Sequence, residues 1–164
     1  MLRKSVLAFV LVSVASPALA AQVKVKAGTP VIVTPDQTIS SENVSGGDTI
    51  SGTVVTGVKI DGKTVIEGGA GAKLSISRVE KSGSIGEGGA LQVKVDSVYS
   101  VDGQRIPVSG SKSVRGEDKT TESVAVGAIL CPLALLMEGD KAELSSNTEI
   151  RAMTQTESMV RVEG

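Results

Sequence analysis

Serine and lysine are the residue types in this chain that could form a nucleophile and its base. The 164 residues include no histidine, which excludes a Ser-His-Asp or Cys-His site and an ordinary histidine-ligated zinc centre. Serine and lysine are plentiful, so a Ser-Lys dyad stays open as chemistry, but no local motif supports it. We therefore expect a protein that is not an enzyme and that needs no cofactor.

Two further segments have the composition of ligand sites but not the spacing. Glu117 and Asp118 lie in a charged, polar stretch that lacks the D-x-D-x-D-G spacing of a calcium loop, so we expect a solvated surface there. The glycine-rich stretch from Gly83 to Gly89 lacks the G-K-[ST] ending of a phosphate loop and does not lead into a helix. We interpret it as a flexible hairpin connection. The sequence thus predicts neither a metal site nor a phosphate site.

The run Val124–Met137 contains no charged residue. As a helix it would reach about 21 Å at ~1.5 Å per residue, short of the ~30 Å of a bilayer core, and Pro132 would kink it. Three interpretations stay open: a buried helix or strand that covers the barrel, a loop that touches lipid or another subunit, and a short transmembrane element. Because exposed apolar segments mark interfaces, we predict interface residues here. They are Val124, Val126, Ile129, Leu130, Leu133, Leu135, Leu136 and Met137.

The single cysteine, Cys131, lies in the middle of this apolar run. It has no partner for an intrachain disulfide, although in an oxidising compartment it could pair with a second chain. We favour the simpler interpretation of a small buried hydrophobe.

The first twenty residues have the three-part layout of a secretory signal peptide. Arg3 and Lys4 precede an apolar core, and Ala18 and Ala20 occupy the small-residue positions before the expected cleavage point. The apolar core is too short for a membrane anchor. We therefore expect an exported protein, in the periplasm or at the outer membrane, with residues 21–164 as a single domain.

The composition of residues 21–164 excludes some classes of binding partner. Loss of Arg3 and Lys4 leaves 15 basic against 18 acidic residues, a net charge of −3, which provides no basic surplus for nucleic acid. Tyr99 is then the sole aromatic residue, so stacking on bases or sugar rings is nearly excluded. The expected partners are an envelope protein or further copies of this chain, with peripheral contact to the outer membrane.

Alternating apolar residues between turn signals predict an all-β fold. Asp61-Gly62 and Asp102-Gly103 each separate two strand-like segments, and Asp-Gly tolerates the two positive φ angles of a two-residue hairpin. We expect a small curled antiparallel sheet or β-barrel with Asp-Gly hairpins and one short apolar insertion. That insertion is Val124–Met137, in helical or other form.

Three segments share a pattern in which an apolar residue precedes a turn that leads into a strand. They are Val25–Val33, Ile66–Leu74 and Leu144–Ala152, and Gly28, Gly69 and Asn147 occupy the same place in each. Glycine and asparagine accept left-handed backbone conformation most readily. The unequal spacing argues against a solenoid. We predict equivalent turns at three corners of one barrel.

Four phrases of the sequence resemble a group of small exported bacterial envelope proteins. They are V-x-A-G-T-P-V-x-V from Val25, D-Q-T-I-S-S from Asp36, G-D-T-I from Gly47 and D-G-K-T-V-I-x-x-G-A from Asp61. Their pattern is similar in turn to the C-terminal β-barrel domain of TrbI-type scaffold proteins of conjugation and type IV secretion machines. That domain forms a ring at the outer membrane, and an apolar insertion projects from it towards lipid.

The resemblance implies a structural or assembly role, with Val124–Met137 as a reduced insertion. The third turn departs from the pattern, since Ser146-Asn147-Thr148 replaces Ala-Gly-Thr, and no inner-membrane helix is expected once the signal is removed. A stand-alone barrel is therefore expected, not a full scaffold. The alternative function is a periplasmic module that binds an extended peptide or envelope polymer at an open barrel edge.

Overall fold

The computed structural model describes residues 21–83, 87–117 and 139–162. These ranges fold as the predicted all-β domain and contain no helix. The strands are β1 (Ala21–Val25), β2 (Pro30–Pro35), β3 (Ile39–Ser40), β4 (Thr49–Val54), β5 (Val58–Ile60), β6 (Lys63–Ile66), β7 (Gly71–Glu80), β8 (Ala90–Tyr99), β9 (Arg105–Arg115), β10 (Glu143–Leu144), β11 (Ile150–Thr154) and β12 (Ser158–Val162).

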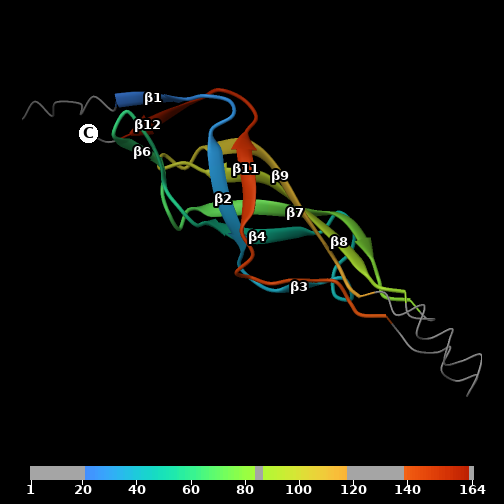
Figure 1. Ribbon diagram of the computed structural model, residues 1–164. Coiled ribbons are helices and arrows are strands. Elements are labelled where there is room, and N and C mark those ends of the chain that lie inside the picture. Colours follow the sequence, from blue (N-terminus) through green and yellow to red (C-terminus); the bar gives the residue numbers. More distant parts are fainter. Residues whose placement is uncertain (1–20, 84–86, 118–138, 163–164) are drawn as a thin grey trace, which may run out of the picture.

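Six of these strands form a closed antiparallel barrel in the order β11-β2-β4-β7-β8-β9 (Figure 1). Three small two-stranded sheets, β1-β12, β5-β6 and β3-β10, accompany it. The strands β1, β12, β5 and β6 gather at one end of the molecule, and β7, β8 and β9 extend to the other. The barrel therefore has two distinct ends.

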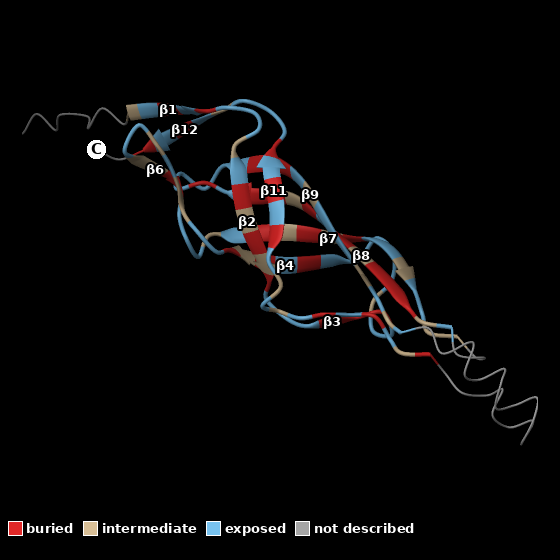
Figure 2. Cartoon of the chain, viewed as in Figure 1, coloured by how far each residue is buried: buried red, intermediate tan, exposed pale blue. Residues whose placement is uncertain are grey.

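The barrel interior is filled by aliphatic side chains, which Figure 2 shows as alternating buried positions along the strands. On β8, Leu91, Val93 and Val95 are buried and Gln92 and Lys94 face outwards, because successive strand residues point to opposite faces. This alternation is the one that the sequence predicts. A core without aromatic side chains is consistent with a narrow, tightly curled sheet.

Glycine allows the sheet to curl closely at β4. A Cβ on Gly52 would overlap the Leu74 side chain and the Thr34 carbonyl oxygen. The chain leaves this sheet after Val54, and β5 begins directly after Gly57, so that β4 and β5 are separate strands in separate sheets. Glycine within a strand commonly marks such bends.

Several predicted features lie outside the described residues. These are the signal peptide at residues 1–20, Cys131, Asp118 and the whole run Val124–Met137 with its eight predicted interface residues. No helix of the described ranges is long and apolar enough to cross a membrane.

Candidate functional site: the loop cluster and the β7–β9 trough

The first two predicted turns have the left-handed glycine that the sequence requires. Gly28 has a φ of 83° and Gly69 a φ of 91°, and their amides donate to the Thr154 and Val54 carbonyls, each at 2.8 Å. Each turn leads directly into a barrel strand, β2 or β7. These residues are corners of the fold.

The third predicted turn differs in its backbone. Asn147 does not have a positive φ, so the expectation of a left-handed residue there is wrong. The turn is instead closed by a hydrogen bond of 2.9 Å from the Thr148 amide to the Ser145 carbonyl, and it leads into β11. A turn closed between residues i and i+3 needs no left-handed residue when it is of type I. The apolar pattern holds at all three places, since Val25, Ile66 and Leu144 are all buried.

The two Asp-Gly pairs form different turns. Asp61 and Gly62 have φ angles of 51° and 77° and join Ile60 to its partner Lys63, which is the two-residue arrangement of a type I′ hairpin. At the β8–β9 connection only Gly103 has a positive φ, of 77°. A two-residue hairpin at Asp102-Gly103 is therefore the wrong expectation.

The β8–β9 hairpin is longer because the Asp102 side chain organises it. Ser100 pairs with Gln104 through a 2.9 Å backbone bond, so the loop is Val101-Asp102-Gly103. One Asp102 oxygen accepts from the Ser100 hydroxyl and the Gln104 amide, and the other accepts from the Arg161 amide at 2.9 Å. The carboxylate therefore joins this hairpin to β12.

These contacts set the pKa of Asp102. Partial burial by itself raises the pKa, but the hydrogen bonds from Ser100 and from the Arg161 and Gln104 amides outweigh that effect, so the pKa lies below its ordinary value. The charged form of Asp102 is the one that holds the hairpin to β12.

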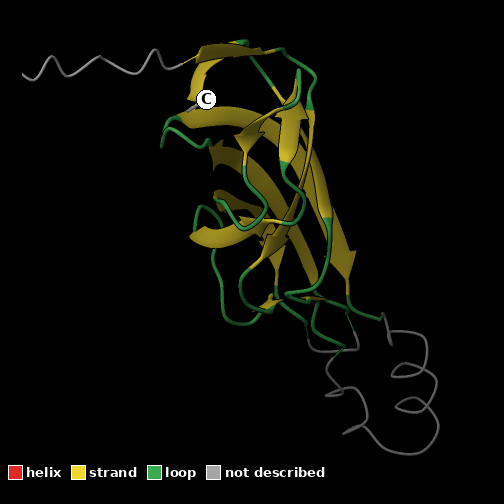
Figure 3. Cartoon of the chain, turned by 90° about the vertical axis from the view of Figure 1, so that its left-hand side faces the viewer, coloured by secondary structure: helices red, strands yellow, loops and turns green. Residues whose placement is uncertain are grey.

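Five short ranges converge at the opposite end of the barrel, and we call residues 41–42, 82–83, 87–89, 116–117 and 139–142 the loop cluster. Figure 3 shows loops gathered at this end of the strands. Backbone hydrogen bonds link Gly116 to Gly89 and Gly89 to Asp140, each at 2.9 Å. The Asp140 amide donates to the Glu117 carbonyl at 3.2 Å. The described residues on either side of positions 118–138 therefore lie next to each other.

Glycine makes this convergence sterically possible. A Cβ on Gly116 would overlap the Asp140 carbonyl oxygen, and one on Gly88 would lie 2.6 Å from the Gly116 carbonyl oxygen. Gly89 is also confined, with the Ser41 hydroxyl oxygen 2.8 Å from the place of a Cβ. The glycine-rich stretch that the sequence marks as a flexible connection is thus closely packed in its described residues Gly88 and Gly89.

Side chains fasten two more segments of the loop cluster. The buried Ser41 hydroxyl accepts from the Ala142 amide at 3.1 Å, and Glu42 accepts from both the amide and the hydroxyl of Ser82 at 3.0 Å. The Ser82 hydrogen bonds lower the pKa of Glu42, with Lys81 and Lys141 contributing in the same direction. Glu143 in turn raises the pKa of Lys141 through a 2.8 Å ion pair. The loop cluster is therefore held by charged as well as backbone contacts.

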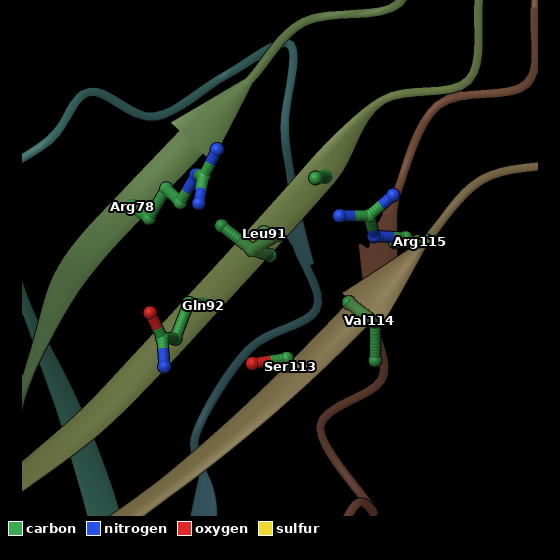
Figure 4. Close-up of a pocket in the computed structure, with 7 residues that line it drawn as sticks. Arg78, Leu91, Gln92, Ser113, Val114 and Arg115 are labelled. Carbon is green, nitrogen blue, oxygen red and sulfur yellow. The ribbon is translucent and has the colours of Figure 1, made fainter.

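A second surface lies on the outer face of β7, β8 and β9. Two adjoining hollows of about 220 and 270 Å³ share Gln92. Together they make what we call the β7–β9 trough, and Figure 4 shows the first of them, with Arg78 and Arg115 on either side of β8. Its polar side chains include Arg78, Gln92, Lys94, Ser111, Ser113 and Arg115.

Neither surface was predicted residue by residue from the sequence. Part of the trough could have been found from the outward positions of β8, since Gln92 and Lys94 alternate with buried residues. On β9, the next strand, Ser111 and Ser113 are exposed, but Lys112 between them is exposed as well, so the alternation does not single them out. The sequence provides a weaker indication of the loop cluster, because the residues next to each glycine do not show which distant carbonyl groups pack against it.

The described residues bear on two arrangements considered from the sequence, a Ser-Lys pair and a metal site. The buried serines of these ranges, Ser40, Ser41, Ser97 and Ser100, make no hydrogen bond to a lysine amine. Within the same ranges no three potential metal ligands cluster. No protein-family model matches the chain, and no curated protein matches it.

Proposed function

We propose that this chain is a non-enzymatic β-barrel of the cell envelope that acts as a structural or assembly protein. In this proposal it is exported by residues 1–20 and works in the periplasm or against the outer membrane, with an envelope protein or copies of itself as partner. The resemblance to the TrbI-type barrel domain belongs to the same proposal. The ring that the TrbI-type domain forms is the source of the expectation of self-assembly.

One observation carries the proposal. The loop cluster fixes Glu117 and Asp140 side by side through a backbone hydrogen bond, and the 21 residues between Glu117 and Gly139 include the uncharged run Val124–Met137. This arrangement supports the proposal that the barrel presents the apolar segment to a binding partner. An envelope setting provides partners of that kind.

The test compares apolar-to-charged substitutions in two places. We expect Leu133→Asp with Leu135→Asp to abolish oligomers or envelope association in native mass measurement and cross-linking, while thermal unfolding stays cooperative. The matched control is Met153→Asp, since Met153 is 59% exposed on β11 and outside the loop cluster. A mutant that is simply insoluble would show that the run is core. A wild-type protein that stays strictly monomeric and recovers no partner would contradict the assembly role.

The alternative is a module that binds an extended peptide or envelope polymer. The six barrel strands close through the β9–β11 pairing, so this sheet has no end strand to which a peptide could add. The observation that favours the alternative is the β7–β9 trough, which follows the strands over the outer face of β8. In this alternative, the peptide or polymer therefore binds to the outer face of β8 and not to an open sheet edge.

A further inference from the structure

We propose that the β7–β9 trough binds an extended acidic peptide segment with carboxylates at alternate positions. The inference refines the alternative function above and is independent of the assembly role.

The trough is positively charged in a chain that is acidic overall. Its lining includes the cations Arg78, Lys94 and Arg115 and no carboxylate. The nearest acids pair at its margins, with Glu80 on Arg78 and with Asp96 on Lys94 at 3.9 Å. Arg115 has no ion pair with any described residue. Charge complementarity therefore favours an anionic occupant.

The cations lie in rows whose spacing matches an extended peptide. Arg78, Gln92 and Ser113 are cross-strand neighbours in one row, and Ser75, Lys94 and Ser111 form the next. The rows are two residues apart on β8, or roughly 6.8 Å, and an extended peptide repeats its same-side side chains at that distance. Arg115 lies in the preceding row, opposite Ala90. Carboxylates at positions i, i+2 and i+4 would therefore face Arg115, Arg78 and Lys94 in turn.

Small side chains leave room for this contact. Ala90 lies beside Arg115 in the sheet, and in Figure 4 the guanidinium groups of Arg78 and Arg115 flank β8 at this level. An arginine fork binds a carboxylate through two parallel hydrogen bonds, and serine hydroxyls with the Gln92 amide can satisfy peptide groups. The lining contains no aromatic side chain on which a sugar ring could stack, which favours a peptide over a glycan.

Binding can be measured with the full chain and a fluorescently labelled peptide of alternating glutamate and threonine, six residues long. The controls are a peptide with the same composition in two blocks and one with glutamine in place of glutamate. We expect the alternating acidic peptide to bind at least threefold more tightly than either control, and its affinity to fall with added salt.

Three cation variants locate the site. We expect Arg78→Gln, Lys94→Gln and Arg115→Gln each to weaken binding about threefold, as for exposed ion pairs, and the triple variant to abolish it. Glu80→Gln is expected to strengthen binding, since it frees the Arg78 guanidinium. Arg161→Gln is the matched control: it removes the same charge from exposed β12 and should leave affinity unchanged.

The proposal is overturned if the triple variant binds as wild type, if Arg161→Gln is as harmful as Arg115→Gln, or if the block peptide binds equally well. Trough-dependent binding of polygalacturonate without peptide binding would assign the site to an anionic glycan instead. None of these results bears on oligomer formation, which the Leu133 and Leu135 variants test separately.

Discussion

Glycine serves opposite purposes at the two ends of the barrel. In the turn before β2, Gly28 has a positive φ of 83° and open space where a Cβ would lie. In the loop cluster, Gly116 lacks a positive φ, but the Asp140 carbonyl oxygen occupies the Cβ position. The turn before β2 needs glycine because the backbone there is left-handed, and the loop cluster needs glycine because no space is left for a Cβ. A turn glycine can therefore be replaced at the cost of strain, whereas a loop-cluster glycine can be replaced only if another segment moves.

The largest effect is expected for Gly116→Ala. The new methyl group overlaps the Asp140 carbonyl, so residues 140–141 must shift and their hydrogen bonds to Glu117 and Gly89 must weaken. We expect a loss of about 3 kcal/mol in the free energy of unfolding, typical of overpacking a tight site. Urea unfolding followed by circular dichroism measures it.

The matched control is Gly46→Ala, because Gly46 has neither a positive φ nor an atom within 4 Å of a Cβ. That change should be neutral or stabilising by about 0.4–1 kcal/mol. Equal unfolding midpoints for the two variants would show that the loop cluster adapts easily and that crowding is not what distinguishes this end.

At the other end, Gly28→Val should cost about 1–2 kcal/mol, the strain of a left-handed backbone for a residue with a Cβ. No atom obstructs the side chain, so the hydrogen bonds from Gly28 to Thr154 and from Thr154 to Thr29 should persist. Urea unfolding gives the loss, and peptide binding at the β7–β9 trough should be unchanged. A loss larger than that of Gly116→Ala would reverse the comparison between the two ends.

Asp102→Ala should have a smaller effect, about 1 kcal/mol, since it removes hydrogen bonds at a largely exposed hairpin. Because the pKa of Asp102 is lower in the folded chain, its contribution is present above the ordinary value of 3.8 and is lost as the pH falls through the lower folded value. Thermal unfolding of wild type and variant at pH 7 and pH 3 measures both. A difference that persists unchanged at pH 3 would contradict the role of the charged carboxylate.

The sequence predicted those features of the fold that depend on neighbouring residues. Strand alternation placed Leu91, Val93 and Val95 inside, and Asp61-Gly62 has the backbone that its types indicate. Asp102-Gly103 was misread, because the Asp102 carboxylate accepts hydrogen bonds from Ser100 and Gln104 across a three-residue loop, and also from Arg161 on β12, which is distant in sequence. Asn147 was misread because a turn without a left-handed residue fits the same apolar pattern.

The candidate sites depend still more on distant contacts. Gly116 is crowded by Asp140, and the trough combines residues of three strands, so the pattern within one segment could indicate only part of the trough and nothing of the crowding at Gly116. What the sequence did supply was the outward polar position of Gln92 and Lys94 on β8. The pairing register of β7, β8 and β9 then determined which of these residues meet.

The smallest effect is expected at Glu42, whose contact with Ser82 is fully exposed. Hydrogen bonds from the Ser82 amide and hydroxyl lower the pKa of Glu42. These hydrogen bonds link two segments of the loop cluster. The link is therefore fully present at pH values above 4.5, the ordinary pKa of a glutamate, and is lost as the pH falls through the lower pKa of the folded chain. The Ser82 amide proton shift should therefore titrate with a midpoint below 4.5, and the titration should disappear in Glu42→Gln. Glu149→Gln, an exposed change without a hydrogen bond to Ser82, is the control and should leave that titration in place. A midpoint at or above 4.5 would mean that the link is absent in solution, and that backbone contacts between crowded glycines hold the loop cluster without help from charge.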